Sequence, residues 1–228
     1  IKSYAAKGIT NPGSTARFAV APSGVSITIY TIGESTIYID KLQNNQYRSV
    51  ARKDMDLHSD FKCLTEQPVV RDLLQGTSTA RPENSDDPFL RTYRLALLCG
   101  AEFSQHWLNG TEVDDAERRG KVLIAINAQM TRANGVFEKD FGIRLNLVPN
   151  NDVIIYLDIA TDPITSPSNP SGAACQTAIN TNIGNTNYDI GHTVSKGSDN
   201  GNAGCIGCVC VNGNKGLAWT VYSNPSNL

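Results

Sequence analysis

The segment from Arg91 to Val148 constrains the fold more than any other part of this chain. It begins with an almost continuous apolar run, Tyr93–Cys99, which is typical of a strand buried on both faces. Apolar residues then recur at helical spacing from Val113 to Phe137, and Ile143–Val148 has the character of a second strand. A right-handed crossover through the helix would make the two strands parallel. The segment therefore predicts a sheet with one long helix covering one of its faces.

The expected helix carries signals at both ends. Glu112, Asp114 and Asp115 favour its N-terminus because acidic side chains face the positive end of the helix dipole there. Gly142 suits the C-terminal cap because glycine readily adopts the left-handed backbone conformation. The apolar stripe between these ends is a core face, so its Met130 is interpreted as a packing residue and not as part of a cofactor site.

Composition excludes several classes of protein. The 228 residues are 40 % hydrophobic, which is enough for a real core. With a net charge of -2 and no basic stripe, the sequence argues against a nucleic-acid partner. No apolar run is long enough to cross a bilayer, so we expect no membrane partner. The chain lacks an initiator Met and a signal peptide, and we expect it to be a processed piece of a longer protein.

Residues 1–66 have the pattern of a small antiparallel β domain. Alternation of apolar and polar residues predicts strands at 17–30, 36–42 and 46–55, separated by turns. Phe61–Glu66 is expected to end that sheet. Strands this short are not stable alone, so the domain should pack on another body.

Residues 67–90 form the clearest boundary in the sequence. Gly, Ser, Thr, Pro, Asn and Asp are mixed there without periodicity, as in an exposed segment that is easily cut. The segment is either a passive linker or a maturation site, with Arg71 and Arg81 as candidate cleavage points. The remaining part, residues 91–228, is predicted to be a second domain.

Beyond the strand–helix–strand unit, the sequence alternates between short apolar segments and loops. Val153–Leu157 and Tyr188–Ser195 are predicted strands, and residues 174–183 a short helix. Gly204–Val211 is expected to be an edge strand because of its glycines and cysteines, and the residues after it are expected to be turns.

Six cysteines suit an oxidising, extracellular compartment better than the cytosol. Cys63, near the end of the first domain, is either a structural thiol or a thiolate that reaches a metal in the neighbouring domain. In a strand, Cys208 and Cys210 would point to the same face. The disulfide connectivity does not follow from these positions.

Four blocks extend in order over Arg91–Leu228: YRLALLCGAEF, TRANGVFEKDFGIRL, NYDIGH and CVC. They resemble the reprolysin-like metzincins, which are secreted zinc metalloendopeptidases related to the adamalysins, here of the bacterial type. The opening IKSYAAKGI and the FKCLTE element resemble the propeptide that precedes such catalytic domains. The resemblance implies an α+β or α/β chain: a small antiparallel β propeptide domain, then the N-terminal subdomain of a metzincin, a mixed twisted sheet with a long covering helix.

The chain departs from this family at the catalytic motif. The family binds zinc through H-E-x-x-H-x-x-G-x-x-H, whose Glu acts as the general base. This chain has only His58, His106 and His192, and none is followed by Glu. We therefore expect no catalytic residue in this chain and zinc ligands downstream of it, in the C-terminal half of the same catalytic domain. Calcium is left open, because four acidic residues lie in or near turns without a recognisable ligand spacing: Asp152, Asp158, Asp162 and Asp199.

The resemblance also implies roles for particular residues. In metzincins a peptide substrate lies along an antiparallel edge strand above the cleft, and family order puts Gly204–Val211 there. The implied substrate-binding residues are Gly204, Cys205, Ile206, Gly207, Cys208 and Val209. The alternative is an edge strand that is simply pinned by disulfides. Cys63 is implied to be an inhibitory zinc ligand, as in propeptides that block the metal until they are cut.

The resemblance bears on the other cysteines as well. Cys210 best matches a cysteine that pairs with the C-terminal half of the domain, so its partner is expected outside this chain. Cys175 with Cys205 or Cys208 is the favoured internal bridge.

Three functions remain open from the sequence. The chain is either part of a secreted zinc endopeptidase zymogen acting on peptides or proteins, inactive alone, or a metzincin-like module that binds peptides without catalysis, or a structural, adhesive ectodomain. The sequence that follows Leu228 would separate the first from the others.

Overall fold

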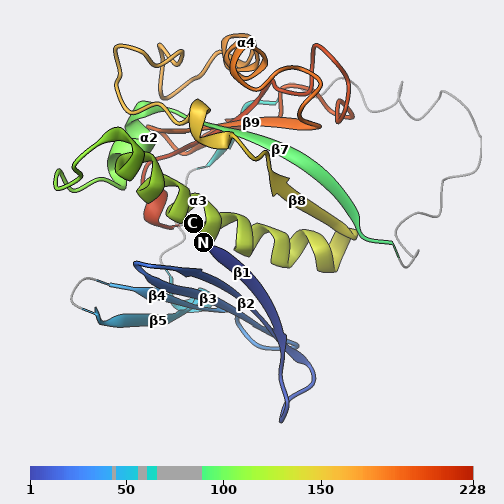
Figure 1. Cartoon of the computed structure of the whole chain (residues 1–228). Coiled ribbons are helices and arrows are strands. Elements are labelled where there is room, and N and C mark those ends of the chain that lie inside the picture. Colours follow the sequence, from blue (N-terminus) through green and yellow to red (C-terminus); the bar gives the residue numbers. More distant parts are fainter. Residues whose placement is uncertain (43–44, 56–60, 66–88, 228) are drawn as a thin grey trace, which may run out of the picture.

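The computed structural model describes residues 1–42, 45–55, 61–65 and 89–227. Its elements form four layers (Figure 1). The N-terminal sheet packs on one side of the long helix α3 (Asp115–Phe141), and the second sheet packs on its other side. Helix α4 (Gly172–Asn182) covers the far face of the second sheet. The predicted α+β architecture is confirmed. Within the described residues no helix has both the length and the apolar character that a membrane span requires.

The N-terminal sheet is an antiparallel meander of five strands in sequence order. They are β1 (Lys2–Lys7), β2 (Ser14–Ala21), β3 (Gly24–Thr31), β4 (Ile37–Lys41) and β5 (Tyr47–Ala51), followed by the 3-10 turn η2 (Arg52–Asp54). The single strand predicted over residues 17–30 is wrong. A tight turn at Pro22-Ser23 folds it into the hairpin β2–β3, in which Ala21 pairs with Gly24. Strand β1 was not predicted because all of its residues are exposed and its sequence, KSYAAK, lacks a regular alternation of apolar and polar residues.

The second sheet has six strands in the order β6-β10-β11-β9-β7-β8. They are β6 (Lys62–Cys63), β7 (Arg91–Cys99), β8 (Ile143–Leu147), β9 (Ile190–Lys196), β10 (Asn200–Asn202) and β11 (Ala218–Tyr222). Strands β8, β7, β9 and β11 are mutually parallel, as predicted for β7 and β8. Strand β10 runs antiparallel to β11, and β6 is parallel to β10. The expectation that Phe61–Glu66 ends the N-terminal sheet is therefore wrong.

Helix α3 begins and ends where its sequence signals place it. The Asp114 side chain accepts a hydrogen bond from the Glu117 backbone N–H at 2.8 Å, and Gly142 caps the C-terminus with φ 63°. The short helix α2 (Ala101–His106) and the 3-10 turns η2 and η3 (Asn151–Ile154) were not predicted. Turn η2 replaces residues 52–54 of the strand expected over 46–55. Turn η3 takes the first two residues of the strand expected over Val153–Leu157, of which a single bridge remains, between Cys99 and Ile155. The tail expected as turns contains β11 and the 3-10 turn η4 (Pro225–Asn227).

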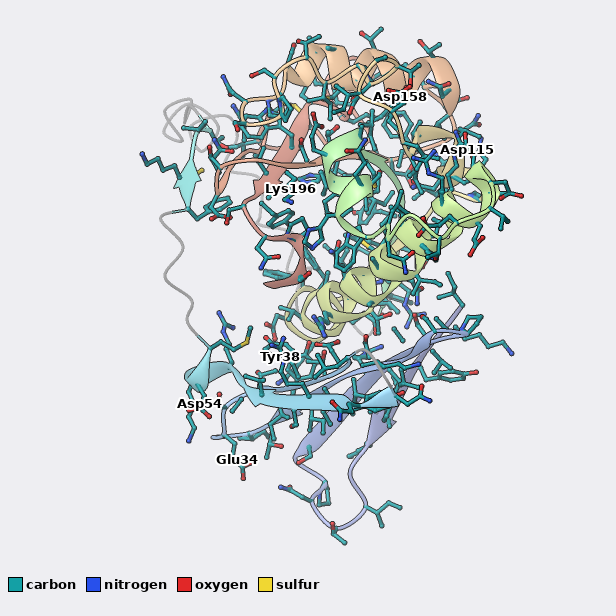
Figure 2. The ribbon with its side chains drawn as sticks, turned by 90° about the vertical axis from the view of Figure 1, so that its left-hand side faces the viewer. Glu34, Tyr38, Asp54, Asp115, Asp158 and Lys196 are labelled. Carbon is teal, nitrogen blue, oxygen red and sulfur yellow. A yellow bond between two sulfur atoms is a disulfide. The ribbon has the colours of Figure 1, made fainter. Side chains whose placement is uncertain are left out.

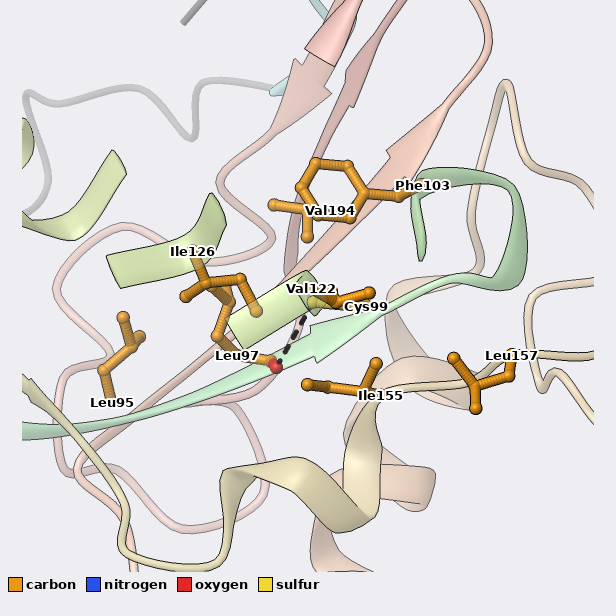
Figure 3. Packing of buried hydrophobic residues seen from close by; sticks show 9 residues of the cluster. All are labelled: Leu95, Leu97, Cys99, Phe103, Val122, Ile126, Ile155, Leu157 and Val194. Atoms are coloured by element: carbon orange, nitrogen blue, oxygen red, sulfur yellow. Dashed lines mark hydrogen bonds between the residues drawn. The ribbon is translucent and has the colours of Figure 1, made fainter. Parts of the chain in front are cut away.

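Strand β7 divides the core into two clusters. Leu95, Leu97 and Cys99 face α3 and pack with Val122 and Ile126 (Figure 3). Ala96 and Leu98 point to the opposite face, toward α4. Both sets are at most 5 % exposed, so the prediction that this strand is buried on both faces is confirmed.

The N-terminal sheet is joined to α3 mainly by polar contacts. Arg17 of β2 forms an ion pair with Glu138, and Arg132 pairs with Asp40 of β4. The same Arg132 lies 5.2 Å from the ring centre of Tyr38, which is at this interface in Figure 2. Tyr30 donates a hydrogen bond to the Arg132 carbonyl, and the absence of a side chain at Gly135 leaves room for its ring. The N-terminal sheet therefore packs on α3.

Candidate functional site

The antiparallel edge of the second sheet lies a few residues before its predicted place. Strand β10 covers Asn200–Asn202, and the structure puts Gly204–Val211 in the turns that follow it. Gly204 has φ 69°, and a Cβ there would lie 2.5 Å from the Cβ of Leu217. The left-handed backbone at Gly204 does not continue an extended strand, and bends and turns follow it. The strand expected over Gly204–Val211 is therefore wrong. The substrate-binding role implied for Gly204–Val209 stays a prediction, now for loop residues beside the edge.

Strand β6 occupies the outer side of β10. The backbone N–H of Lys62 donates to the Asp199 carbonyl at 3.0 Å, and that of Leu64 donates to the Gly201 carbonyl at 2.7 Å. Two contacts anchor the end of this segment. The Asn202 side-chain amide donates to the Leu64 carbonyl at 3.2 Å, and the Ala203 N–H donates to the Thr65 hydroxyl at 2.7 Å. A short segment that follows the N-terminal sheet in the sequence thus adds a strand to the edge of the second sheet.

The register of the sheet determines which way Cys63 faces. Cys63 pairs with Gly201, and Gly201 pairs with Thr220 of β11. The same row continues through Val194 of β9 to Cys99 of β7. Paired residues in a sheet share a face, and Val194 and Cys99 belong to the cluster that packs against α3. Cys63 therefore lies on the α3 side of the sheet, at its edge.

Cys63 is an exposed, free thiol. Hydrogen bonds from the Thr65 side chain and backbone lower the pKa of this thiol below its ordinary value. Since the thiolate is the nucleophilic and metal-binding form, these contacts favour its reactive state.

The other cysteines are paired differently from the expectation. Cys205 and Cys208, which are three positions apart in the sequence, form a disulfide within the loop after β10. Cys175 is a buried free thiol on α4, facing the core, so the favoured bridge from Cys175 to Cys205 or Cys208 is absent. Cys210 is exposed and free, with φ 64°, and its N–H donates to the Asp189 carbonyl.

The two histidines that the structure describes, His106 and His192, do not belong to a cluster of metal ligands. His192 is hydrogen-bonded through Nε2 to the Thr220 hydroxyl at 2.9 Å, and burial lowers its pKa to about 4. His106 contacts Ser226 at 2.7 Å, and burial, then the charge of Lys196, lowers its pKa. His58 lies outside the described residues. In the described part of the chain no three His, Cys, Asp or Glu side chains come together as metal ligands, so these residues do not fit a zinc site by themselves.

The four acidic residues considered for calcium do not form a ligand cluster in the described part of the chain. Three of them accept local hydrogen bonds. Asp158 accepts from the Ala160 N–H, and Asp199 accepts from Ser223. Asp162 accepts from the N–H groups of Ala101 and Ile164. Asp152 is exposed in η3.

A cavity of about 770 Å³ lies elsewhere, between the N-terminal sheet and α3. Three charged side chains on its wall have partners: Arg132 and Asp40 pair with each other, and Lys121 pairs with Glu112. It shares no lining residue with the β6–β10 edge and is not a candidate catalytic site.

Sequence reasoning missed Gly201, Thr220 and the docking of β6. The alternation in Ala218–Tyr222 was a usable signal for β11, since Trp219 and Val221 are buried there and the residues between them less so. The three residues of β10 have no such signal, because Asn-Gly-Asn is typical of a loop.

Comparison with protein families gives one match. Residues 123–227 match the model of the metallo-peptidase family M12B, reprolysin-like. Members of that family are zinc-dependent. The search of curated proteins and the search of solved structures gave no significant match. The matched residues include most of α3, β8, α4, β9, β10 and β11, and therefore the whole edge that β6 occupies.

Proposed function

Residues 123–227 match the model of the reprolysin-like M12B metallopeptidases, and from that match we propose that the chain is part of a secreted zinc metalloendopeptidase zymogen. Residues 1–66 are its propeptide domain, and residues 91–228 are the N-terminal half of its catalytic domain. The helix that binds zinc lies downstream. The observation that carries this proposal is the addition of β6 to β10, because a segment of the first domain occupies the exposed edge of the second.

The edge strand is suited to hold a peptide. An open edge offers unpaired N–H and C=O groups, and an extended peptide pairs with them as an added strand. In this chain the Asp199 and Gly201 carbonyls are already used by Lys62 and Leu64. A substrate that needs the same groups cannot bind until this segment leaves. Occupation of the edge thus supports a latent form that is released by cleavage in residues 67–90.

Cys63 adds a second means of inhibition. Its thiol faces the α3 side of the sheet, and its lowered pKa favours the thiolate, which is a strong zinc ligand. The described residues do not form a metal site, so the remaining ligands would come from the C-terminal half of the domain. We assign Cys63 as the inhibitory ligand of that zinc.

Secretion is supported by the cysteines. The Cys205–Cys208 disulfide requires an oxidising compartment to persist. It closes a loop directly beside the proposed peptide site, where reduction would loosen the edge.

The test is a peptidase assay on the full-length gene product. We expect hydrolysis of an unfolded protein substrate after cleavage in residues 67–90, loss of activity with a zinc chelator, and recovery with added Zn²⁺. This chain alone should contain almost no zinc by elemental analysis. The absence of a His-Glu-x-x-His motif after Leu228, or a cleaved product that remains inactive with zinc, would contradict the proposal.

The second candidate is a module that binds peptides without catalysis. It is favoured by the fact that the edge site consists wholly of residues of this chain and needs no metal. A gene that ends near Leu228, together with peptide binding by the chain, would favour this candidate.

A further inference from the structure

The aromatic ring of Phe61 lies against the backbone of Gly201. A Cβ built on Gly201 would be 3.0 Å from Cζ and 3.7 Å from Cε2 of that ring, and 3.2 Å from the Trp219 carbonyl oxygen. Any side chain at position 201 would therefore compete with the ring for space. Glycine inside a strand often marks a place where another group approaches closely. Here the approaching group is an aromatic side chain from a different domain.

The backbone of the same segment fixes the ring in place. The hydrogen bonds from Lys62 to Asp199 and from Leu64 to Gly201 set the register, and Phe61 precedes the first of them. Phe61 is 48 % exposed, so about half of its surface is covered. In peptides bound by strand addition, the main-chain bonds supply affinity and the side-chain contacts supply selectivity. The contact with Gly201 is the selective element of this edge.

We infer that the β10 edge is a binding site for an extended peptide that carries an aromatic side chain over Gly201, and that Phe61 is its resident occupant. The bare Cα of Gly201 leaves room for the edge of the ring, whose Cζ would lie 3.0 Å from a Cβ at this position. The inference deepens the proposed function, because the peptide would be the substrate. Binding itself needs neither zinc nor the downstream half.

The first test measures backbone amide exchange at Lys62 and Leu64 in the 228-residue chain. Phe61→Ala should accelerate exchange at both amides at least tenfold, and Phe61→Tyr should leave it within twofold. Gly201→Ala should accelerate it similarly, because the added methyl displaces the ring. In the double variant the second substitution should add no more than twofold. Tyr47→Ala is the control, since Tyr47 is also 48 % exposed but lies in the N-terminal sheet. Unchanged exchange in Phe61→Ala, or fully additive effects, would overturn the inference.

The second test supplies the occupant as a separate peptide. The pentapeptide Phe-Lys-Ser-Leu-Thr, which copies residues 61–65 with serine for Cys63, is added to the Phe61→Ala chain that also carries Lys62→Pro and Leu64→Pro. The two prolines remove the N–H groups that hold the resident segment, so it does not compete for the Asp199 and Gly201 carbonyls. We expect shifts in the NMR amide signals of Gly201 and Asn202, with a Kd at least tenfold lower than for Ala-Lys-Ser-Leu-Thr. Equal affinity for the two peptides, or no binding of either, would overturn the inference.

These results separate the inference from the proposed function. A chain that selects the aromatic peptide while the cleaved gene product is inactive would retain the inference and remove the peptidase. If the cleaved gene product is an active peptidase but this chain binds the two peptides equally, the proposed function stands and the inference about Gly201 fails.

Discussion

Arg17 of β2 and Glu138 of α3 form an ion pair of 2.5 Å between the N-terminal sheet and the long helix. Arg144 approaches the other oxygen of the same carboxylate at 2.7 Å. Burial alone would raise the pKa of Glu138, but the hydrogen bonds from Arg144 and Arg17 outweigh it and leave the pKa lowered. One carboxylate thus holds two cations at the interface of the two domains.

We predict that Glu138→Gln destabilises the chain by about 2 kcal/mol at pH 7, because charged hydrogen bonds are lost at a largely buried site. Because the folded pKa is lowered, this stabilisation is present above the unfolded pKa of about 4.3 and is lost as pH falls through the folded value. Urea unfolding at pH 7 and pH 3 measures both effects. Asp115→Asn is the control: its exposed ion pair with Arg118 should contribute less than about 1 kcal/mol. Equal losses in the two variants would contradict this assignment.

His192 also makes the stability of the fold depend on pH, but here burial disfavours the charged form of the side chain instead of hydrogen bonds favouring it. Burial lowers its pKa to about 4, so the folded chain keeps it neutral where the unfolded chain, with a pKa of about 6.5, is protonated. The free energy of unfolding should therefore fall as pH drops from about 6.5 toward 4. We expect a loss of about 2 kcal/mol, which is smaller than the full effect of the pKa shift because the ring keeps some contact with solvent. His192→Gln should flatten this part of the curve in urea unfolding between pH 7.5 and 4.5. Parallel curves for the variant and the parent would show that His192 does not cause the loss.

The N-cap of α3 offers a test of local origin. Asp114→Ala removes the acceptor for the Glu117 N–H and should cost about 1 kcal/mol in unfolding free energy. Asp114→Ser should retain most of the stability, since serine also caps well. If the alanine and serine variants lose the same unfolding free energy, the hydrogen bond from the Glu117 N–H to Asp114 does not supply this stability.

Elements with a long and continuous sequence pattern could be predicted better than elements with a short one. Helix α3 extends over 27 residues with an acidic start and Gly142 at its end, so its limits could be predicted closely. Strand β7 could be predicted because Leu95–Cys99 is an uninterrupted run of apolar residues, and all five are buried in the structure. The β2–β3 hairpin was missed because alternation continues across its turn, and the turn itself has no glycine before Gly24.

The candidate site could be predicted only in part. The family resemblance placed an antiparallel edge strand at Gly204–Val211, whereas the antiparallel strand is β10 at Asn200–Asn202. The glycines and cysteines at 204–211 were a more conspicuous pattern than Asn-Gly-Asn. The docking of Lys62–Cys63 on β10 is a contact between residues about 138 positions apart, which periodicity does not encode. The Cys205–Cys208 bridge was missed for another reason: six cysteines allow many pairings, and spacing alone does not choose among them.

The most direct test of the zymogen account is the activity of the uncleaved full-length gene product with Cys63→Ser. Lys62→Ser is the control, because Lys62 is the neighbour of Cys63 in β6 and its backbone N–H, which the substitution keeps, donates to the Asp199 carbonyl. The account predicts that Cys63→Ser raises peptidase activity of the uncleaved protein at least tenfold, while Lys62→Ser leaves it latent. Equal latency of Cys63→Ser and the parent, both fully activated by cleavage in residues 67–90, would contradict the assignment of Cys63 as the inhibitory ligand.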